Sequence, residues 1–282
     1  MNLGLMTNNL ARPVVIAVAP NGARKTKADH RKLPISPEEL AQTARACQEA
    51  GAAMIHLHVR DSKNQHSLDP DHYRAAITKV RTEVGDEMII QVTTESVGKY
   101  TPIEQMDCVK QLKPEAVSIA IGELIPTVGQ DLEAARFLEW LHKNQIAPQF
   151  ILYSEADIEH FTKLVQRGLI HSDNPNVLLV LGKYSTNQQS DPKELSPLIE
   201  CLHAQTYWSV CAFGQSESEC MAKAIELGGH CRIGFENNLL NENGDLAIDN
   251  ANQVEFSAAK ARLSKRGLAS ASEARLLLGV RC

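Results

Sequence analysis

The chain has 282 residues, of which 43% are hydrophobic and 22% are charged, and its formal net charge is -5. This is the composition of an ordinary globular protein with enough apolar material for a large core, which excludes a disordered chain. The acidic balance, and the absence of any Lys/Arg cluster with interleaved aromatic residues, argue against a nucleic-acid partner.

The seven cysteines bear on the cellular compartment. Their number is odd, no C-x-x-C pair occurs, and several lie in apolar periodic segments, where a free thiol behaves as a small hydrophobe. This usage favours a reducing compartment over a disulfide framework. The N-terminal "MNLGLMTNNLARP" lacks a charged region leading into an apolar run, and no stretch of about 18 apolar residues occurs. We therefore expect a cytoplasmic protein that does not bind a membrane, with a loosely ordered segment at 1–12.

Strand-like apolar runs alternate with segments of helical period, at intervals of about 25 to 35 residues. The first helix begins with Ser36 as N-cap and Pro37 at its first position, Glu39 completes a capping box, and Gly51 is the stop. The eight strands are predicted at 14–20, 54–61, 88–96, 116–123, 147–154, 176–183, 207–214 and 230–237. Their helices are predicted at 36–51, 69–84, 101–112, 131–145, 155–170, 191–205, 216–229 and 252–267, and one more helix at 270–279.

Eight βα units without a break in composition predict a single (β/α)8 TIM barrel domain over residues 1–282, with an extra C-terminal helix. The alternative is an open doubly wound sheet, which also uses parallel strands. The G-x-G-x-x-G fingerprint that usually follows the first strand of such a sheet is absent here, and this favours the barrel.

In a parallel barrel the chemistry lies at the C-terminal ends of the strands, and side chains alternate between the two faces. In "MIHLHVRD" (54–61), His56, His58 and Arg60 therefore share the inward face, while Leu57 and Val59 point to the helices. This is the wrong pattern for a purely apolar core.

Two other predicted strands also turn polar side chains inward. Arg232, Gly234 and Glu236 share a face of the eighth strand. On the third strand the inward residues are Gln91, Thr93 and Glu95; Thr94 points outward unless the strand twists at its end.

His56 and His58 can bind one divalent ion, and Glu236 from across the barrel would complete the three-ligand open site of a catalytic zinc. The alternative is that both histidines are satisfied polar groups at the barrel mouth. For Arg60 and Arg232 two interpretations stay open, an ion pair with Asp61 or Glu95 and the binding of a substrate carboxylate. The remaining histidines of loops and helices are expected to be solvated, and His230 to be structural; the solvated set is His66, His72, His142, His160, His171 and His203.

The segment "LPISPEELAQTARACQEAGAAMIHLHVRD", together with "GGHCRIGFENNLL" and "SASEARLLLG", resembles the β-keto acid cleavage enzymes, the family that includes 3-keto-5-aminohexanoate cleavage enzyme. The H-x-H-x-R-D and R-x-G-x-E segments are specific in combination. The resemblance implies a zinc-bearing (β/α)8 barrel that exchanges acyl units between a β-keto acid and acetyl-CoA, giving acetoacetate and a new CoA thioester. It also implies that His56, His58 and Glu236 are the ligands of Zn2+ or another divalent metal.

The same resemblance also shows where this chain departs from the family around His56, His58 and Glu236, which we call the metal set. The family's general-base aspartate is replaced by Asn237, an acidic position after the first strand by Arg24, and two glycines by Glu95 and Ser96 in "TTES". After the fourth strand, where the resemblance leads us to expect a threonine or asparagine, this chain has "IAIGELIP" with Glu123. The catalytic positions carried over are Arg232, Asn237, Thr93 and Glu95, and the substrate-binding positions are Arg60, Thr94, Ser96, Glu123 and Arg24.

Three functions follow as hypotheses. The first is a divergent metal-dependent enzyme of this family. If Glu95, Glu123 and Arg24 face its cavity, it either prefers a neutral or cationic substrate or has its proton acceptor moved to Glu95 or Glu123. The second is a metal-binding barrel that has lost the base, motivated by Asn237 and Arg24. The third is an amidohydrolase-like zinc hydrolase, which fits less well because the later histidines and lysine of such enzymes are missing. The resemblance is also compatible with a homo-oligomer, a dimer or tetramer.

Overall fold

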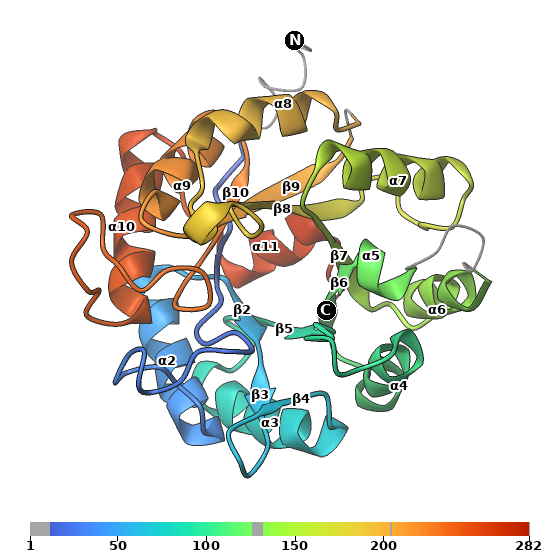
Figure 1. The fold of residues 1–282 in the computed structure, drawn as a ribbon, viewed down its shortest axis with the longest axis horizontal. Coiled ribbons are helices and arrows are strands. Elements are labelled where there is room, and N and C mark those ends of the chain that lie inside the picture. Colours follow the sequence, from blue (N-terminus) through green and yellow to red (C-terminus); the bar gives the residue numbers. More distant parts are fainter. Residues whose placement is uncertain (1–11, 126–131, 204, 282) are drawn as a thin grey trace.

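Eight parallel strands close into a barrel in the order β1-β10-β9-β8-β7-β6-β5-β2 (Figure 1). The computed structural model describes residues 12–125, 132–203 and 205–281. The predicted loosely ordered segment at 1–12 therefore lies outside the described residues, except for Arg12. The closed barrel confirms the predicted fold class. The strands are β1 Ile16–Val18, β2 Met54–Leu57, β5 Ile89–Thr93, β6 Ala116–Ala120, β7 Ala147–Leu152, β8 Asn176–Leu181, β9 Tyr207–Ala212 and β10 His230–Ile233.

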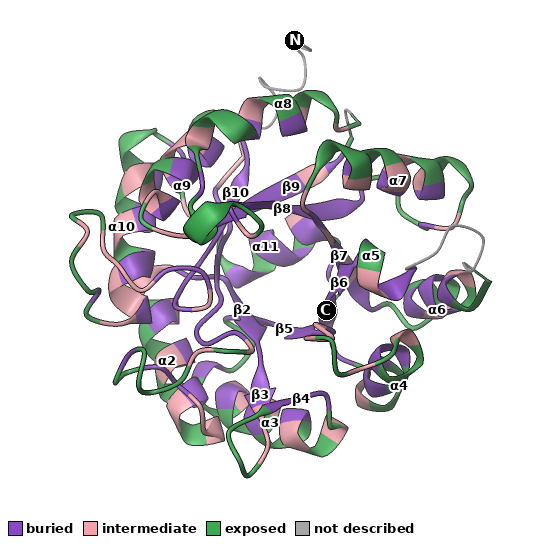
Figure 2. Cartoon of the chain, viewed as in Figure 1, coloured by how far each residue is buried: buried purple, intermediate pink, exposed green. Residues whose placement is uncertain are grey.

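Helices surround the barrel, each with a buried inner face and an exposed outer face (Figure 2). The capping box predicted from Ser36 and Glu39 is present, and Gly51 ends that helix in the left-handed conformation. None of the helices in the described part of the chain combines the length and apolarity that crossing a bilayer requires. The helices are α2 Pro37–Ala50, α3 Pro70–Val84, α4 Pro102–Leu112, α5 Ile121–Leu124, α6 Leu132–Lys143, α7 Glu155–Gln166, α8 Leu195–Glu200, α9 Glu217–Glu226, α10 Asn250–Leu263 and α11 Ala271–Leu278, with short 3-10 turns η1 Thr186–Gln188 and η2 Pro192–Glu194.

The largest core lies between the strands and the surrounding helices. Leu57 and Val59 belong to it, together with Tyr73 of α3 and Val254 of α10, all of them buried. This confirms the predicted outward direction of Leu57 and Val59. Since alternate residues of the same segment must then point to the barrel axis, the inward direction of His56 follows from the same packing.

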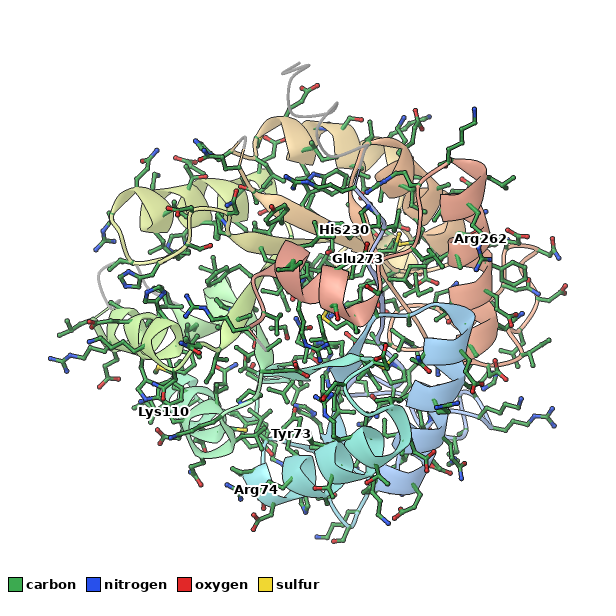
Figure 3. The ribbon with its side chains drawn as sticks, turned by 180° about the vertical axis from the view of Figure 1, so that it is seen from behind. Tyr73, Arg74, Lys110, His230, Arg262 and Glu273 are labelled. Carbon is green, nitrogen blue, oxygen red and sulfur yellow. The ribbon has the colours of Figure 1, made fainter. Side chains whose placement is uncertain are left out.

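The extra C-terminal helix closes the bottom of the barrel. Ala274 and Leu278 of α11 pack in one buried cluster with Val15, Met54 and Ile89, which lie at the N-terminal ends of their strands. Seen from behind, α11 lies across this end of the barrel (Figure 3). The opposite end, where the strands finish, therefore remains as the place for a site.

The second predicted strand, 54–61, is wrong in its second half. β2 ends at Leu57, and β3 (Val59–Arg60) pairs antiparallel with β4 (His66–Ser67) in a separate two-stranded sheet. A barrel strand and a hairpin share the period of two, so the sequence pattern cannot separate them. The chain leaves the barrel at His58, whose carbonyl accepts a hydrogen bond from Asn21 Nδ2 at 3.2 Å.

The described cysteines are free, as expected. Cys201 is exposed. The buried ones lie in the hydrophobic layers, and they are Cys47, Cys108, Cys211, Cys220 and Cys231.

Candidate active site

Three side chains converge at the C-terminal end of the barrel. His56 Nε2 and His58 Nε2 are 3.1 Å apart, and Glu236 Oε2 lies 3.3 Å from His58 Nε2 and 3.6 Å from His56 Nε2. Both histidines are 1% exposed. Ligand atoms bonded to one tetrahedral zinc at about 2.0 Å are themselves roughly 3.3 Å apart, so these separations suit a single ion.

A buried chain of amides orients His56. Gln91 Oε1 lies 2.8 Å from His56 Nδ1, Gln91 Nε2 donates to Gln149 Oε1, and Gln149 Nε2 donates to Asn176 Oδ1, each at 3.2 Å. Because the relay makes the Gln91 oxygen an acceptor, Nδ1 of His56 carries the proton and Nε2 keeps its lone pair. Burial, and then the charge of Arg232, lowers the pKa of His56 to about 3, so the ring is neutral as a metal ligand requires.

Glu236 reaches the histidines from the turn after β10. Gly234 adopts a left-handed φ of 133°, and Glu236 N donates to Ala19 O at 3.0 Å. This turn places the Glu236 carboxylate beside the two histidines at the C-terminal end of the barrel. Its Oε1 lies 3.0 Å from Arg232 Nη2. Burial alone would raise the pKa of Glu236, but the charge of Arg232 holds it well below its usual value. The carboxylate is therefore ionised.

The donor set fits a divalent metal. Glu236 Oε2 is buried without a hydrogen-bond partner and faces the two Nε2 atoms. Two neutral imidazoles and one carboxylate with an open fourth position are the set used by catalytic zinc sites. These residues, His56, His58 and Glu236, are therefore the ones that would hold the ion.

A narrow cavity, partly open to solvent, lies over the three side chains. The lining includes apolar, hydroxyl-bearing and charged side chains. Its lining comprises His56, His58, Thr93, Thr94, Glu95, Ser118, Ala120, Glu123, Ile151, Tyr153, Val180, Lys183, Phe213, Arg232 and Glu236.

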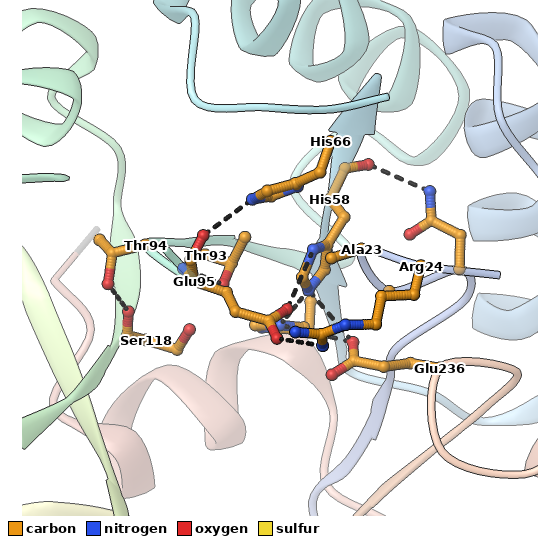
Figure 4. A network of polar contacts seen from close by, with 12 residues as sticks. Ala23, Arg24, His58, His66, Thr93, Thr94, Glu95, Ser118 and Glu236 are labelled. Carbon is orange, nitrogen blue, oxygen red and sulfur yellow. Dashed lines mark hydrogen bonds and ion pairs between the residues drawn. The ribbon is translucent and has the colours of Figure 1, made fainter. Parts of the chain in front are cut away.

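Most of the residues selected from the sequence line this cavity. Thr94, expected to point outward unless the strand end twisted, does line it, because β5 ends at Thr93 and the chain turns there. Thr94 Oγ1 donates to Ser118 O at 2.9 Å (Figure 4). Glu123 Oε2 accepts from Ser96 N at 2.9 Å and from Gln105 Nε2 at 3.0 Å.

Four selected residues, Arg24, Arg60, Ser96 and Asn237, are not among the described residues that line the cavity. Arg24 lies at its edge, where Nη1 contacts Glu95 Oε1 at 3.1 Å, with the arginine side chain 65% exposed. Asn237 is buried, and neither polar atom of its side chain has a hydrogen-bond partner.

For Arg60 and Arg232 the first of the two open interpretations, an ion pair with Asp61 or Glu95, is wrong. Arg232 pairs with Glu236, four residues along the chain, and not with Asp61 or Glu95. Arg60 donates to the carbonyls of Gly22, Ala23 and Lys25, because β3 carries it out of the barrel and over the loop that follows β1.

His66 is another correction, since it is not solvated but 5% exposed. The β3/β4 hairpin places it over the site, where His66 Nε2 donates to Glu95 O at 2.8 Å and its ring lies 5.3 Å from that of His58. A hairpin after a barrel strand has no signal in the hydrophobic pattern. His230 has a structural role as expected, because its Nδ1 accepts from Val15 N at 3.0 Å.

Sequence reasoning missed Lys183 and Ser118. Lys183 Nζ lies 3.5 Å from Glu95 Oε1 and 5.3 Å from the centre of the Phe213 ring. Ser118 Oγ is buried in the lining without a partner. Both could have been found by the rule applied to the other strands, since Lys183 stands two residues after the end of β8 and Ser118 points inward on β6.

Comparisons with known proteins agree with this geometry. The family model for the beta-keto acid cleavage enzyme matches residues 13–280. The chain is 28% identical to 3-keto-5-aminohexanoate cleavage enzyme of Acetoanaerobium sticklandii, over 95% of this chain and 98% of that protein. It is 27% identical to 3-oxoadipate:acetyl-CoA acetyltransferase of Cupriavidus necator, with 96% of each chain covered.

Among solved structures, the apo structure of ObcA superposes with a TM-score of 0.72 at 17% identity, over 88% of this chain and 66% of that one. At this identity the likeness shows the fold alone. The family match extends over nearly the whole described barrel and includes the three converging side chains. The chain therefore belongs to the β-keto acid cleavage enzyme family.

Proposed function

We propose that this protein cleaves a β-keto acid with acetyl-CoA as the second substrate, at a zinc or other divalent metal ion held by His56, His58 and Glu236. The products would be acetoacetate and a new CoA thioester. The observation that carries the proposal is the convergence of these three ligand atoms inside the cavity of a chain that belongs to this family.

The metal, when bound, supplies Lewis acidity that polarises a keto oxygen. The surrounding residues orient the acid. Arg232 Nη1 and Ser118 Oγ are buried in the lining without partners, so each can donate to a substrate oxygen. Thr93 and Thr94 line the same cavity, and we assign them to substrate positioning.

Proton transfer belongs in this proposal to one of the two other carboxylates of the cavity, Glu95 or Glu123. The amide of Asn237 cannot take a proton. Glu123 already accepts two hydrogen bonds with Oε2, whereas Glu95 Oε2 faces the metal set. Glu95→Gln and Glu123→Gln, compared for kcat, separate the two assignments.

The charge of the cavity suits an acid. The lining carries the cations Lys183 and Arg232 together with three carboxylates, and Arg24 contacts Glu95 Oε1 from the edge. These charges roughly cancel, so a bound divalent ion would leave the site with an excess of positive charge. The prediction of a neutral or cationic substrate considered Glu95, Glu123 and Arg24 but not the positive charge of Lys183. We propose instead that Lys183 attracts the anionic group of the β-keto acid.

The experiment is to incubate the zinc-loaded protein with acetyl-CoA and a panel of β-keto acids, and to detect new CoA thioesters by mass spectrometry. We expect a thioester from at least one acid, and none from the His56→Ala/His58→Ala double variant. A fully metal-loaded protein that yields no thioester across the panel contradicts the proposal.

A second candidate, a metal-binding barrel without turnover, is favoured by one observation, the buried amide of Asn237 where the family has a carboxylate. It predicts tight metal binding with no thioester from the wild-type protein. If Asn237→Asp alone then produced thioester, the chain would have lost only its base.

A further inference from the structure

We propose that Glu95 is a positioning residue that holds the metal ligand His58 through the outer nitrogen of its ring. This inference rests on the metal site of the proposed function, but it concerns a different pair of atoms. It does not depend on which carboxylate takes the substrate proton.

The two histidine ligands differ in what holds them. Both turn Nε2 toward Glu236, so each must carry its proton on Nδ1 when Nε2 binds an ion. His56 Nδ1 has the oxygen of Gln91 at 2.8 Å, whereas His58 Nδ1 is buried without a hydrogen-bond partner. A buried N–H left without an acceptor is costly, and the structure places the Oε2 atom of Glu95 at 3.9 Å from it.

Glu95 is held so that Oε2 faces His58. Thr93 Oγ1 accepts from Glu95 N at 3.0 Å, and His66 Nε2 donates to Glu95 O at 2.8 Å. Its other oxygen, Oε1, contacts Arg24 at 3.1 Å (Figure 4). The same oxygen lies 3.5 Å from Lys183 Nζ. With Oε1 occupied by two cations, Oε2 is the oxygen left for the imidazole.

A shift of about 1 Å would turn the 3.9 Å contact into a charge-assisted hydrogen bond. Histidine ligands of metals commonly donate their second N–H to a carboxylate, which fixes the ring and makes the bound nitrogen more basic. The site would then use one amide, Gln91, and one carboxylate, Glu95, to orient its two imidazoles.

Glu123 provides a matched control. It is the other carboxylate of the cavity outside the metal set, and its Oε2 is engaged by Ser96 N and Gln105 Nε2. Its loss removes the same charge from the same cavity without touching a histidine that binds the metal.

The experiment measures zinc affinity of the metal-free protein by competition with a chromophoric chelator. Glu95→Ala should weaken zinc binding by roughly 10–100-fold, the range typical for the loss of an outer partner of a histidine ligand. Glu95→Gln should lose less, because its amide oxygen still accepts the N–H, and Glu123→Ala should stay within about twofold of the wild type. The absorption spectrum of the Co2+-loaded protein should change in Glu95→Ala and not in Glu123→Ala.

Zinc affinity within about twofold of the wild type in Glu95→Ala overturns the inference, as does an equal loss in Glu123→Ala. If Glu95→Ala does not fold without metal, Glu95→Leu, which also lacks an acceptor for the N–H but fills more of the space, carries the same comparison. A wild-type protein that binds no zinc refutes the metal site itself and the inference with it. A protein with the expected affinities that forms no thioester refutes the proposed function alone.

Discussion

Gly22 lies against Glu236 so closely that a Cβ atom on Gly22 would stand 2.6 Å from Cγ of Glu236. Gly22 also adopts a left-handed φ of 60°. The loop after β1 thus forms one side of the space that the third ligand occupies, and only a residue without a side chain fits there.

Gly22→Ala is therefore expected to push Glu236 off the metal set and to weaken zinc binding by at least tenfold. Gly98→Ala is the matched control, because Gly98 also has a positive φ, of 74°, but a Cβ there meets nothing within 4 Å. Both variants carry the backbone strain, and Gly22→Ala alone carries the clash. Equal zinc affinities for the two variants, measured by chelator competition, would contradict this account.

The metal ligands themselves should be indispensable. His56→Ala removes a ring nitrogen from the convergent set and should lower zinc affinity by more than the 10–100-fold expected for an outer partner. Metal content after dialysis, measured by elemental analysis, should fall from about one ion per chain to near zero. His72→Ala, which removes a histidine outside the convergent set, should keep the wild-type content. Retention of the ion by His56→Ala would disprove the assignment.

The amide relay behind His56 predicts a graded effect. Gln91→Met removes the acceptor of the His56 N–H and should weaken zinc binding by roughly 10–100-fold. Gln149→Met, one step further along the relay, leaves that acceptor in place and should cost less. Zinc titrations of both variants test the order, and a larger loss in Gln149→Met would count against the relay.

Lys183 should determine how tightly the acid binds. Lys183→Met is expected to raise KM for an anionic β-keto acid by roughly tenfold, with a smaller change in kcat, because a charge-assisted contact to the ground state is lost. The control is Lys193→Met, an exposed lysine of η2 outside the cavity lining. If KM is unchanged in Lys183→Met, the carboxylate binds elsewhere.

A buried carboxyl outside the site should make stability depend on pH. Glu217 is 4% exposed, its Oε2 accepts from Asn238 Nδ2 at 3.2 Å, and its Oε1 has no partner. Burial raises the pKa of Glu217 to about 8. Between about pH 4.5 and pH 8 the folded protein keeps a proton that the unfolded chain releases, so this group's contribution to the free energy of unfolding falls as pH rises, by about 1.4 kcal/mol per pH unit.

Glu217→Gln removes this proton equilibrium. Its free energy of unfolding in urea, compared with the wild type at pH 5, 6.5 and 8, should therefore rise relative to the wild type as pH increases. Glu219→Gln, which removes an exposed carboxylate from the same helix, should show a nearly constant difference. A constant difference for Glu217→Gln as well would mean that Glu217 is ionised in the folded protein.

The barrel, and the convergence of His56, His58 and Glu236 at one end of it, could be predicted from the sequence. Strand and helix periods are local properties, and so is the capping box of Ser36 and Glu39. In a parallel barrel all strand ends meet at one mouth, so the sequence predicts that His56 and Glu236 converge there. The predicted strand 230–237 was nevertheless too long, because β10 ends at Ile233 and Glu236 lies in the turn that follows it.

The contacts around His56, His58 and Glu236 could not be predicted from the sequence, because they depend on the tertiary structure. Arg60 leaves the barrel and His66 enters the site because a hairpin follows β2, and a hairpin has the same period as a strand. The contacts of Glu95 with Arg24 and Lys183 join the loop after β1, the end of β5 and the end of β8, which are far apart in the sequence. Barrel closure and the paths of the loops bring them together, and periodicity along the chain carries no information about either.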